Sequence, residues 1–516
     1  MKNDKKKNDN EKNSNNSHLD FEEPLKIENH EPPVTRRDFL GRGLIAGAAA
    51  VVAPTLFSLS SSKAFAGVTA EECGILSDKG NKVPFICVDL SGGANIAGSN
   101  VLVGGPGGQK DFLSIAGYSK LGLPETMIPS LDNQIATMDD SGLGLAFHAD
   151  SALLKGIKDI ATQDTLNNVN GAVMCARSSN DTSDNPHNPM YGIYKAGANG
   201  DLLPLIGSRS SDSGGRSVAP PSMIDLSVRP TKINSGNDAR GLIDTGKLAE
   251  LLPSPVDPST GLPTNDDAVN VMKTIQRISE KKLGRLQTSA EINKIIECRY
   301  LESATAAAGS ADRTNIDKDD NLFNLFDERG FNMSDFQKTA AVSKLVVNGV
   351  AGAGTIQFGG YDYHNSTRTT GDDRDRKAGR EIGAALEYAS RQGKKVMIYV
   401  FSDGSVASDG TLDETGKGIW KNDNSSTAAS LMLVYDPNGL PEIINNNSQI
   451  GHFRPSGSIE TAATVISDNV EQLAESVILN FMALNGDVGK FTETFPNHGL
   501  GTTAADLDKL IAFAPI

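Results

Sequence analysis

Short, nearly continuous apolar runs alternate with segments of helical periodicity along most of the chain. Runs such as those at 83–90 and 395–402 are typical of strands that are covered on both faces. We therefore expect an α/β fold with a mostly parallel central sheet and helices on both faces. The expected strands span 83–90, 171–177, 354–359, 395–402 and 428–435, and the expected helices span 151–161, 241–252, 334–350, 375–392 and 469–484.

The middle of the chain interrupts this rhythm. From 266 to 307 the pattern is helical and charged, and we expect an inserted helical cap over 253–333. Two segments rich in Pro, Gly and Ser, 204–222 and 253–265, are typical of the long surface connections that often frame a site.

The first 66 residues differ in composition from the rest. Residues 1–34 are rich in Lys, Asn, Asp, Glu and Ser, which predicts a disordered polar tail. Over 35–66, the pair Arg36 and Arg37 precedes an apolar run and a small-x-small cleavage site, Ala64-Phe65-Ala66. This order is the pattern of a twin-arginine export signal.

The alternative interpretation of this segment is a membrane anchor. The apolar run from Leu44 to Phe57 is rich in Gly and Ala and is shorter than the roughly 20 residues that span a bilayer. We therefore expect export by the twin-arginine translocase, cleavage, and a mature domain over 67–516 that has no stable membrane span. That domain would lie in the periplasm or outside the cell.

The net charge and the cysteines narrow the class of protein. A formal charge of −15 argues against nucleic-acid or anionic-membrane partners. Cys87 and Cys175 lie in strand-like apolar runs and are expected to be buried thiols. With Cys73 and Cys298 they show no metal-ligand spacing, and the sequence does not choose among the disulfide pairings that four cysteines allow.

Polar residues follow three of the expected strands, and in an open α/β sheet ligands gather at the carboxyl ends of strands. The first group is Ser91, Gly92 and Gly93, where two glycines allow an anion-facing turn and the serine offers a hydroxyl for nucleophilic attack. The simpler interpretation is a tight turn that the serine caps.

The second group is Asp362 and His364, two apart after the strand at 354–359. One carboxylate oxygen and one imidazole nitrogen can converge on a divalent cation, so this is the best metal-ligand candidate. The third is Asp403, at the tip of the strand at 395–402, which would face the same cleft. Hydrogen-bonded turns are the alternative at both places.

The remaining six histidines differ in what their positions indicate. His187 is held between two prolines in a loop, which suits a ligand or substrate contact, and His148 precedes an expected helix. His452 lies in a late loop and is less determined. His18, His30 and His498 are expected to be solvated residues near the ends of the chain.

The order of these pieces resembles a known family. A strand ending in Leu-Ser-Gly-Gly, the segment GLAFHADSALLKGI, a histidine-bearing loop before Met190-Tyr191-Gly192 and the segment VVNGVAGAGTIQFGGYDYH follow the export signal in turn. Over most of 83–490 the chain resembles an uncharacterised family of bacterial twin-arginine-exported proteins related to the alkaline phosphatase and sulfatase superfamily.

The resemblance implies a set of site residues and an alkaline phosphatase-like fold. Asp362 and His364 would be metal ligands, and Asp403 would stand at an acidic strand tip. Ser91 would belong to the anion-facing turn, in the catalytic position. The pocket residues it implies are Gly92, Gly93, His148, His187 and Asp423.

Two departures from the family pattern reduce the expected metal set. Relatives carry further aspartates soon after the Ser-Gly-Gly turn, whereas this chain has no acid before Asp111. Relatives also carry an Asp-His pair that corresponds here to Asp423 and Asn424, and asparagine offers only a neutral oxygen. We therefore expect no more than one divalent ion: zinc, manganese or calcium.

Three functions remain open from the sequence. The first is an exported metal-dependent hydrolase that acts on a small anionic phosphate or sulfate ester. The second is a non-catalytic exported binding or assembly protein on a phosphatase-like scaffold that has lost part of its metal set. The third is a glycan binder, which the scarcity of aromatic residues, with Trp420 as the one tryptophan, disfavours.

Overall fold

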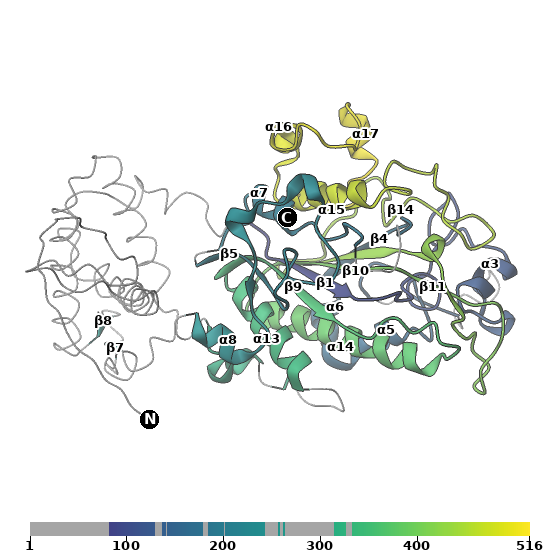
Figure 1. Cartoon of the computed structure of the whole chain (residues 1–516), viewed down its shortest axis with the longest axis horizontal. Helices are drawn as coiled ribbons and strands as arrows, with labels where there is room; N and C mark the ends of the chain where they lie inside the picture. The colour runs from purple at the N-terminus through teal and green to yellow at the C-terminus, as the bar shows by residue number, and fades with distance from the viewer. Residues whose placement is uncertain are drawn as a thin grey trace, which may run out of the picture. The chain divides into compact units, whose positions relative to one another are not determined.

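An eight-stranded sheet forms the centre of the part of the chain that the computed structural model describes (Figure 1). That part comprises residues 82–129, 137–140, 142–178, 184–200, 202–242, 256–257, 262–263, 314–322, 324–326 and 333–516. All of it belongs to the second of two compact units, Ala50–Ile516. The strand order is β14-β4-β13-β10-β1-β9-β5-β6. The strands are β14 (Gln449–Ile450), β4 (Val169–Met174), β13 (Ser430–Tyr435), β10 (Val396–Ser402), β1 (Phe85–Leu90), β9 (Ala351–Phe358), β5 (Leu203–Gly207) and β6 (Thr231–Lys232).

The sheet is mostly parallel, as the apolar runs predict. In the central register, Val88 of β1 lies opposite Val400 of β10 on one side and Ile356 of β9 on the other, and both pairings are parallel. Only β13 runs against its two neighbours in this sheet, β10 and β4. The carboxyl ends of β1, β9 and β10 therefore meet at one edge of the sheet.

Helices cover both faces of the sheet (Figure 1). One apolar core forms between the sheet and α5 (Ala152–Ile160), α13 (Met333–Val347) and α14 (Thr369–Arg391). A second core forms on the other face with α7 (Met190–Lys195) and α15 (Val470–Leu484). Every residue of β1 and β10 is buried, because alternate side chains enter opposite cores.

Small residues let α5 and α14 pack closely. A Cβ added to Gly156 of α5 would lie 2.9 Å from the Cα of Gly379 on α14, which is closer than real Cβ contacts come. The two glycines thus bring the helix backbones together, and α14 is held firmly where its first half approaches the strand ends.

The remaining elements are short. They are α3 (Ile115–Lys120), η2 (Glu125–Met127), β2 (Met138–Asp139), β3 (Phe147–His148), α6 (Gln163–Leu166), η3 (Pro221–Met223), η4 (Leu226–Val228), α8 (Gly236–Gly241), β7 (Val256–Asp257), β8 (Leu262–Pro263), η5 (Ile316–Lys318), η6 (Asp320–Leu322), β11 (Val406–Ala407), β12 (Asn422–Asp423), η7 (Ser425–Thr427), η8 (Val488–Lys490), α16 (Phe491–Thr494) and α17 (Ala504–Asp508).

The five predicted strands are present, and four of the predicted helices are present with shifted ends. Helix α14 begins at Thr369, six residues before the predicted start, because Gly371 and the polar residues around it hide the helical periodicity. The expected surface connection at 204–222 is wrong at its start, where residues form β5 against β9. Beyond its first two residues, the expected helix at 241–252 lies outside the described residues.

Several other expectations also fall outside the described residues. They are the tail at 1–34, the export signal at 35–66, Cys73 and Cys298, and most of the expected cap at 253–333. Within the described chain, Cys87 and Cys175 are free and fully buried, which confirms that expectation.

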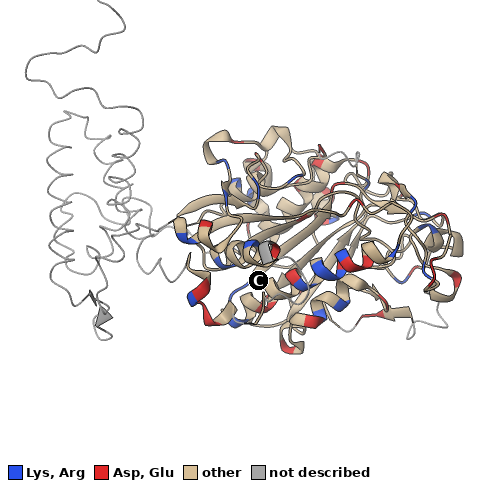
Figure 2. Ribbon diagram, turned by 60° about the horizontal axis from the view of Figure 1, so that its bottom comes forward, with Lys and Arg blue, Asp and Glu red and all other residues tan. Residues whose placement is uncertain are grey.

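Charge and hydropathy are distributed as expected for a sheet between two helical layers. Figure 2 shows charged residues of both signs on the helices and loops around a largely uncharged sheet. No helix among the residues described combines the length and apolarity needed to cross a bilayer.

Candidate metal centre

Asp362, His364 and Asp423 converge at the surface. The Nε2 atom of His364 lies 2.8 Å from Oδ1 of Asp362 and 3.3 Å from Oδ2 of Asp423. One ligating atom from each residue lies within 4.8 Å of the other two, so the cluster could hold a metal ion. The side chains are 62%, 38% and 36% exposed, respectively, which leaves the cluster open to solvent and to a ligand.

The turn after β9 carries Asp362 and His364 and points both outward, because the tyrosines that alternate with them are buried. Tyr361 and Tyr363 are each 1% exposed. The Tyr361 hydroxyl donates to the backbone oxygen of Arg374 at 2.7 Å, and the Tyr363 hydroxyl donates to Oδ1 of Asp375 at 2.9 Å. The two tyrosines fix the backbone of the turn to α14.

A buried polar network extends behind Tyr363. Its hydroxyl accepts a hydrogen bond from the backbone N–H of Asn95 at 2.6 Å, and Asn100 donates from Nδ2 to Oδ2 of Asp375 at 2.7 Å. Burial raises the pKa of Asp375 to about 7, while hydrogen bonds from Asn100 and Tyr363 act in the opposite direction. The segment after β1, the turn after β9 and α14 are therefore joined through one carboxyl group.

Asp423 reaches the cluster on a short hairpin. Strand β12 pairs antiparallel with β11, which places Asp423 opposite Val406. Because β11 follows the tip of β10 directly, this pairing carries Asp423 back over the strand ends. Asn424 does not join the cluster, since its Oδ1 accepts hydrogen bonds from the backbone N–H and the hydroxyl of Ser426 at 3.0 and 2.6 Å.

Asp403, the expected third ligand, lies apart from the cluster that the described residues form. Its side chain is fully buried at the tip of β10. Asn185 donates from Nδ2 to its backbone oxygen at 2.6 Å and to Oδ1 at 3.1 Å. The structure therefore groups Asp423, expected only in the pocket, with Asp362 and His364. Asp403 is instead enclosed in the core.

The Ser-Gly-Gly turn packs directly against the turn that carries Asp362. Gly92 has a φ of +126°, and a Cβ there would lie 2.7 Å from the carbonyl carbon of Tyr361 and closer still to the amide nitrogen of Asp362. The N–H of Gly93 donates to the Tyr361 oxygen at 3.2 Å, and the N–H of Gly404 donates to the Gly92 oxygen at 2.6 Å. The ends of β1, β9 and β10 are thus joined by their backbones.

Ser91 is enclosed within this junction. It is 1% exposed; its hydroxyl donates to Oδ1 of Asp89 at 3.3 Å and accepts from Nε2 of Gln357 at 2.8 Å. Burial raises the pKa of Asp89, against four hydrogen bonds that stabilise its charged form. Two of these come from the backbone N–H groups of Arg216 and Ser217 at 2.7 and 3.0 Å, and they attach the loop after β5 to β1.

The two histidines expected in the pocket are both buried. Both ring nitrogens of His148 bond to the backbone, Nε2 to the oxygen of Met127 at 2.9 Å and Nδ1 to the N–H of Asp150 at 3.1 Å. His187 is 3% exposed and stacks on Phe401, with ring centroids 5.7 Å apart. Burial lowers its pKa to about 4, so His187 is neutral at neutral pH.

His498, expected to be solvated, is instead half-buried. Its ring packs against Phe491 with centroids 4.9 Å apart, and Nδ1 accepts from the N–H of Leu500 at 3.2 Å. The segment near the end of the chain folds onto the α15 face, which distance along the sequence could not reveal.

Sequence reasoning missed the residues that support the turn: Tyr361, Tyr363, Asp375, Asn95 and Asn100. A signal was present in Tyr-Asp-Tyr-His, where bulky aromatic and polar residues alternate. Such alternation indicates that one set is buried while the other points to solvent.

Comparison of the chain with protein families, with curated proteins and with solved structures finds no match. The case for a function therefore rests on the site itself.

Proposed function

We propose that this chain is an exported hydrolase of small phosphate or sulfate esters that works with one divalent cation at Asp362, His364 and Asp423. The observation that carries the proposal is the convergence of one imidazole nitrogen and two carboxylate oxygens at the carboxyl edge of the sheet. In open α/β sheets, ligands bind at this edge. The mostly parallel sheet with its antiparallel β13 supports the finer proposal of an alkaline phosphatase-like scaffold.

The donor set fits a borderline transition metal. Imidazole and carboxylate donors together suit zinc or manganese, whereas calcium is bound by oxygen atoms alone in most protein sites. Three protein ligands leave coordination positions for substrate, as catalytic sites require. A bound cation would supply Lewis-acid polarisation of an ester oxygen.

The two candidate nucleophiles are the Ser91 hydroxyl and a water molecule, and the surroundings of Ser91 distinguish them. Ser91 is enclosed and bonded to both Asp89 and Gln357, so it would have to leave both partners to attack. This favours water as the nucleophile, with Ser91 holding the Ser-Gly-Gly turn against β9. The reaction then cleaves the ester bond and releases an alcohol and the free oxyanion.

A non-catalytic exported binding or assembly protein is the second candidate. The position of Asn424 favours it, because this side chain caps η7 and adds no ligand that a second ion could use. A two-ion arrangement that stabilises both the attacking and the leaving oxygen is not available from these residues.

Metal analysis of the purified full chain separates the two candidates. His364→Ala tests the cluster, and His452→Ala is the matched control because His452 is also half-buried and lies outside it. Nearly stoichiometric zinc or manganese that is lost only in His364→Ala, together with metal-dependent turnover of a phosphate or sulfate ester, supports the hydrolase. A folded chain that binds no metal and cleaves no ester supports the binding protein.

Export is proposed from Arg36 and Arg37 and needs its own test. Replacing both with Lys removes the guanidinium pair but keeps the charge. We expect the double variant to remain in the cytoplasm while the natural chain appears in the periplasm or the medium. Equal export of both would refute the twin-arginine route without bearing on the metal centre.

A further inference from the structure

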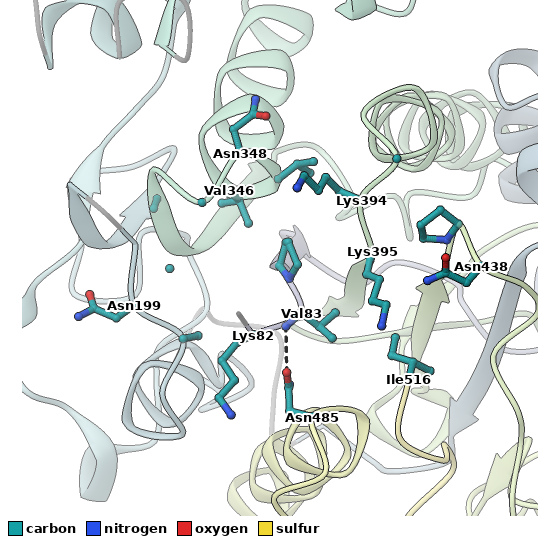
Figure 3. Close-up of a pocket in the computed structure, with 18 residues that line it drawn as sticks. Lys82, Val83, Asn199, Val346, Asn348, Lys394, Lys395, Asn438, Asn485 and Ile516 are labelled. Atoms are coloured by element: carbon teal, nitrogen blue, oxygen red, sulfur yellow. Dashed lines mark hydrogen bonds between the residues drawn. The ribbon is translucent and has the colours of Figure 1, made fainter. Parts of the chain in front are cut away.

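A cavity lies at the edge of the sheet opposite the candidate metal centre, where β1, β9 and β10 begin (Figure 3). Its volume is about 420 Å³, large enough for a small organic molecule. Residues just before β1 and β10 line it, as do the C-terminal end of α13 and the residue after α15. It is therefore separated from the metal centre by the length of the central strands.

The lining of this cavity is cationic. Lys82, Lys394 and Lys395 contribute three ammonium groups from two separate segments, and Figure 3 draws them around the cavity. Among the described residues that line it, none is Asp or Glu, although acids outnumber bases in the chain by 64 to 49. Such a concentration of positive charge in an acidic protein favours an anionic ligand.

The three lysines differ in how far neighbouring acids neutralise them. Lys82 forms an ion pair with Asp487. Lys395 forms a longer ion pair with Asp436, at 3.7 Å. Lys394 is exposed and has no ion pair with any residue that the structure describes. Lys394 is therefore the group with charge to offer a ligand, and the longer pair leaves Lys395 as a second contact.

A simpler role for these lysines would be to cap the helices that end here, since cations stabilise helix C-termini. The helices are already capped by their own backbones. After α13, Gly349 donates to the oxygen of Val346 at 2.9 Å; after α14, Gly393 donates to the oxygen of Ser390 at 2.9 Å. The N–H of Lys394 also donates to the oxygen of Ala389 at 2.9 Å, so the ammonium group is not needed there.

Amide groups complete the lining. Asn348 donates from Nδ2 to the hydroxyl of Tyr388 at 2.7 Å, and Asn485 accepts from the N–H of Val83 at 3.0 Å, so both are fixed in place. Asn199 also lines the cavity and is half-buried. Because the Nδ2 of Asn485 already donates to the oxygen of Phe481 at 2.7 Å, Asn199 is the amide best placed to donate to an oxyanion oxygen of a ligand.

We propose that this cavity binds a small molecule through an oxyanion group (phosphate, sulfate or carboxylate), with Lys394 as its main charged contact and Lys395, which also pairs with Asp436, beside it. This site is independent of the metal centre and of the proposed hydrolase function.

Calorimetric titration of the full chain with inorganic phosphate, sulfate and citrate tests the proposal. Metal is removed first with a chelator, and the titration is repeated in His364→Ala, so that binding at the metal centre does not contribute. We expect saturable binding of one equivalent of at least one probe. Because charge-assisted hydrogen bonds are the strong ones, Lys394→Ala should weaken it about tenfold and Lys394→Glu more.

Lys232→Ala is the matched control, because Lys232 is also exposed but lies on β6, away from the cavity. The site is supported if the affinity is unchanged in Lys232→Ala and reduced in Lys394→Ala and Lys394→Glu, while all three variants keep the melting temperature of the unmodified chain. Absence of saturable binding by any probe overturns it. Equal loss in Lys232→Ala also overturns it, since binding would then follow net charge alone.

Discussion

The phenolic hydroxyl of Tyr363 donates to Oδ1 of Asp375 across 2.9 Å, and this bond connects the turn that carries Asp362 and His364 to helix α14. The same hydroxyl accepts from the N–H of Asn95, so it also joins the segment after β1. The positions of Asp362 and His364, two exposed ligands of the candidate metal centre, therefore depend on a fully buried hydrogen bond.

Tyr363→Phe tests this dependence. The change leaves Oδ1 of Asp375 and the N–H of Asn95 without this partner in a buried site, which should lower the free energy of unfolding by about 1–3 kcal/mol. Tyr363→Phe should also weaken cation binding, because the turn that carries Asp362 and His364 loses its hydrogen bond to α14. Urea denaturation and metal titration measure the two effects.

Tyr435→Phe is the control for that experiment, since Tyr435 loses a hydrogen bond to Ser390, distant from the turn in sequence. Cation affinity should be unchanged in this variant. If Tyr363→Phe lost stability but kept the natural affinity, the bond would support the core without positioning the ligands.

Because Asp423, and not Asp403, lies in the candidate metal centre, conservative variants of the two residues should have different effects. Asp423→Asn removes a ligand charge and should weaken cation binding at least tenfold, or about 1.4 kcal/mol. Asp403→Asn keeps an oxygen that can accept from Asn185 but places an NH2 group where Oδ2 lies in the core, so it should reduce stability with little effect on affinity. Metal titration of both variants beside thermal melts distinguishes them, and the reverse pattern would restore Asp403 as the ligand.

Gly92→Ala should disrupt the junction between the first strand and the Asp362 turn. The positive φ and the backbone atoms close to the added Cβ together should cost more than about 2 kcal/mol of stability. Gly439→Ala is the control, because Gly439 has a φ of +149° and nothing within 4 Å of an added Cβ. Urea denaturation should show the larger loss for Gly92→Ala, and equal losses would mean that the close approach has no energetic consequence.

Glu381 on α14 predicts a pH dependence of stability. Burial raises its pKa to about 7, against lowering contributions from Thr339 and Lys338 of α13 and from Lys377 of its own helix; Asp335 of α13 adds to the rise. The folded chain therefore holds a proton between about pH 4.5 and 7 that the unfolded chain releases. The stability this proton confers is full below that window and is lost as pH rises through it.

Glu381→Gln should remove this slope. Above about pH 7 the variant should be more stable than the natural chain by up to about 3 kcal/mol, because folding raises the pKa of Glu381 from 4.5 to about 7. Urea denaturation across the window measures the difference, and Glu414→Gln, an exposed acid, should show none. Parallel curves for Glu381→Gln and the natural chain would contradict the raised pKa.

Much of the fold could be predicted because its strands are buried on both faces. A strand such as VMIYVFS must be apolar throughout when alternate side chains enter two cores, and that requirement is visible in the sequence. The strands β6 and β14 could not be found this way, because two residues are too few to show a pattern of alternating or continuous apolar positions.

The sequence by itself determined the mostly parallel α/β architecture, the buried thiols and the Asp-x-His turn at a strand end, because each depends on residues that are neighbours along the chain. Only the tertiary structure decided that Asp423 rather than Asp403 joins His364, that Asp375 supports the turn, and that lysines gather at the opposite edge. These relationships unite residues distant in sequence, and their distances are set by how the β11–β12 hairpin and the helices pack on the sheet.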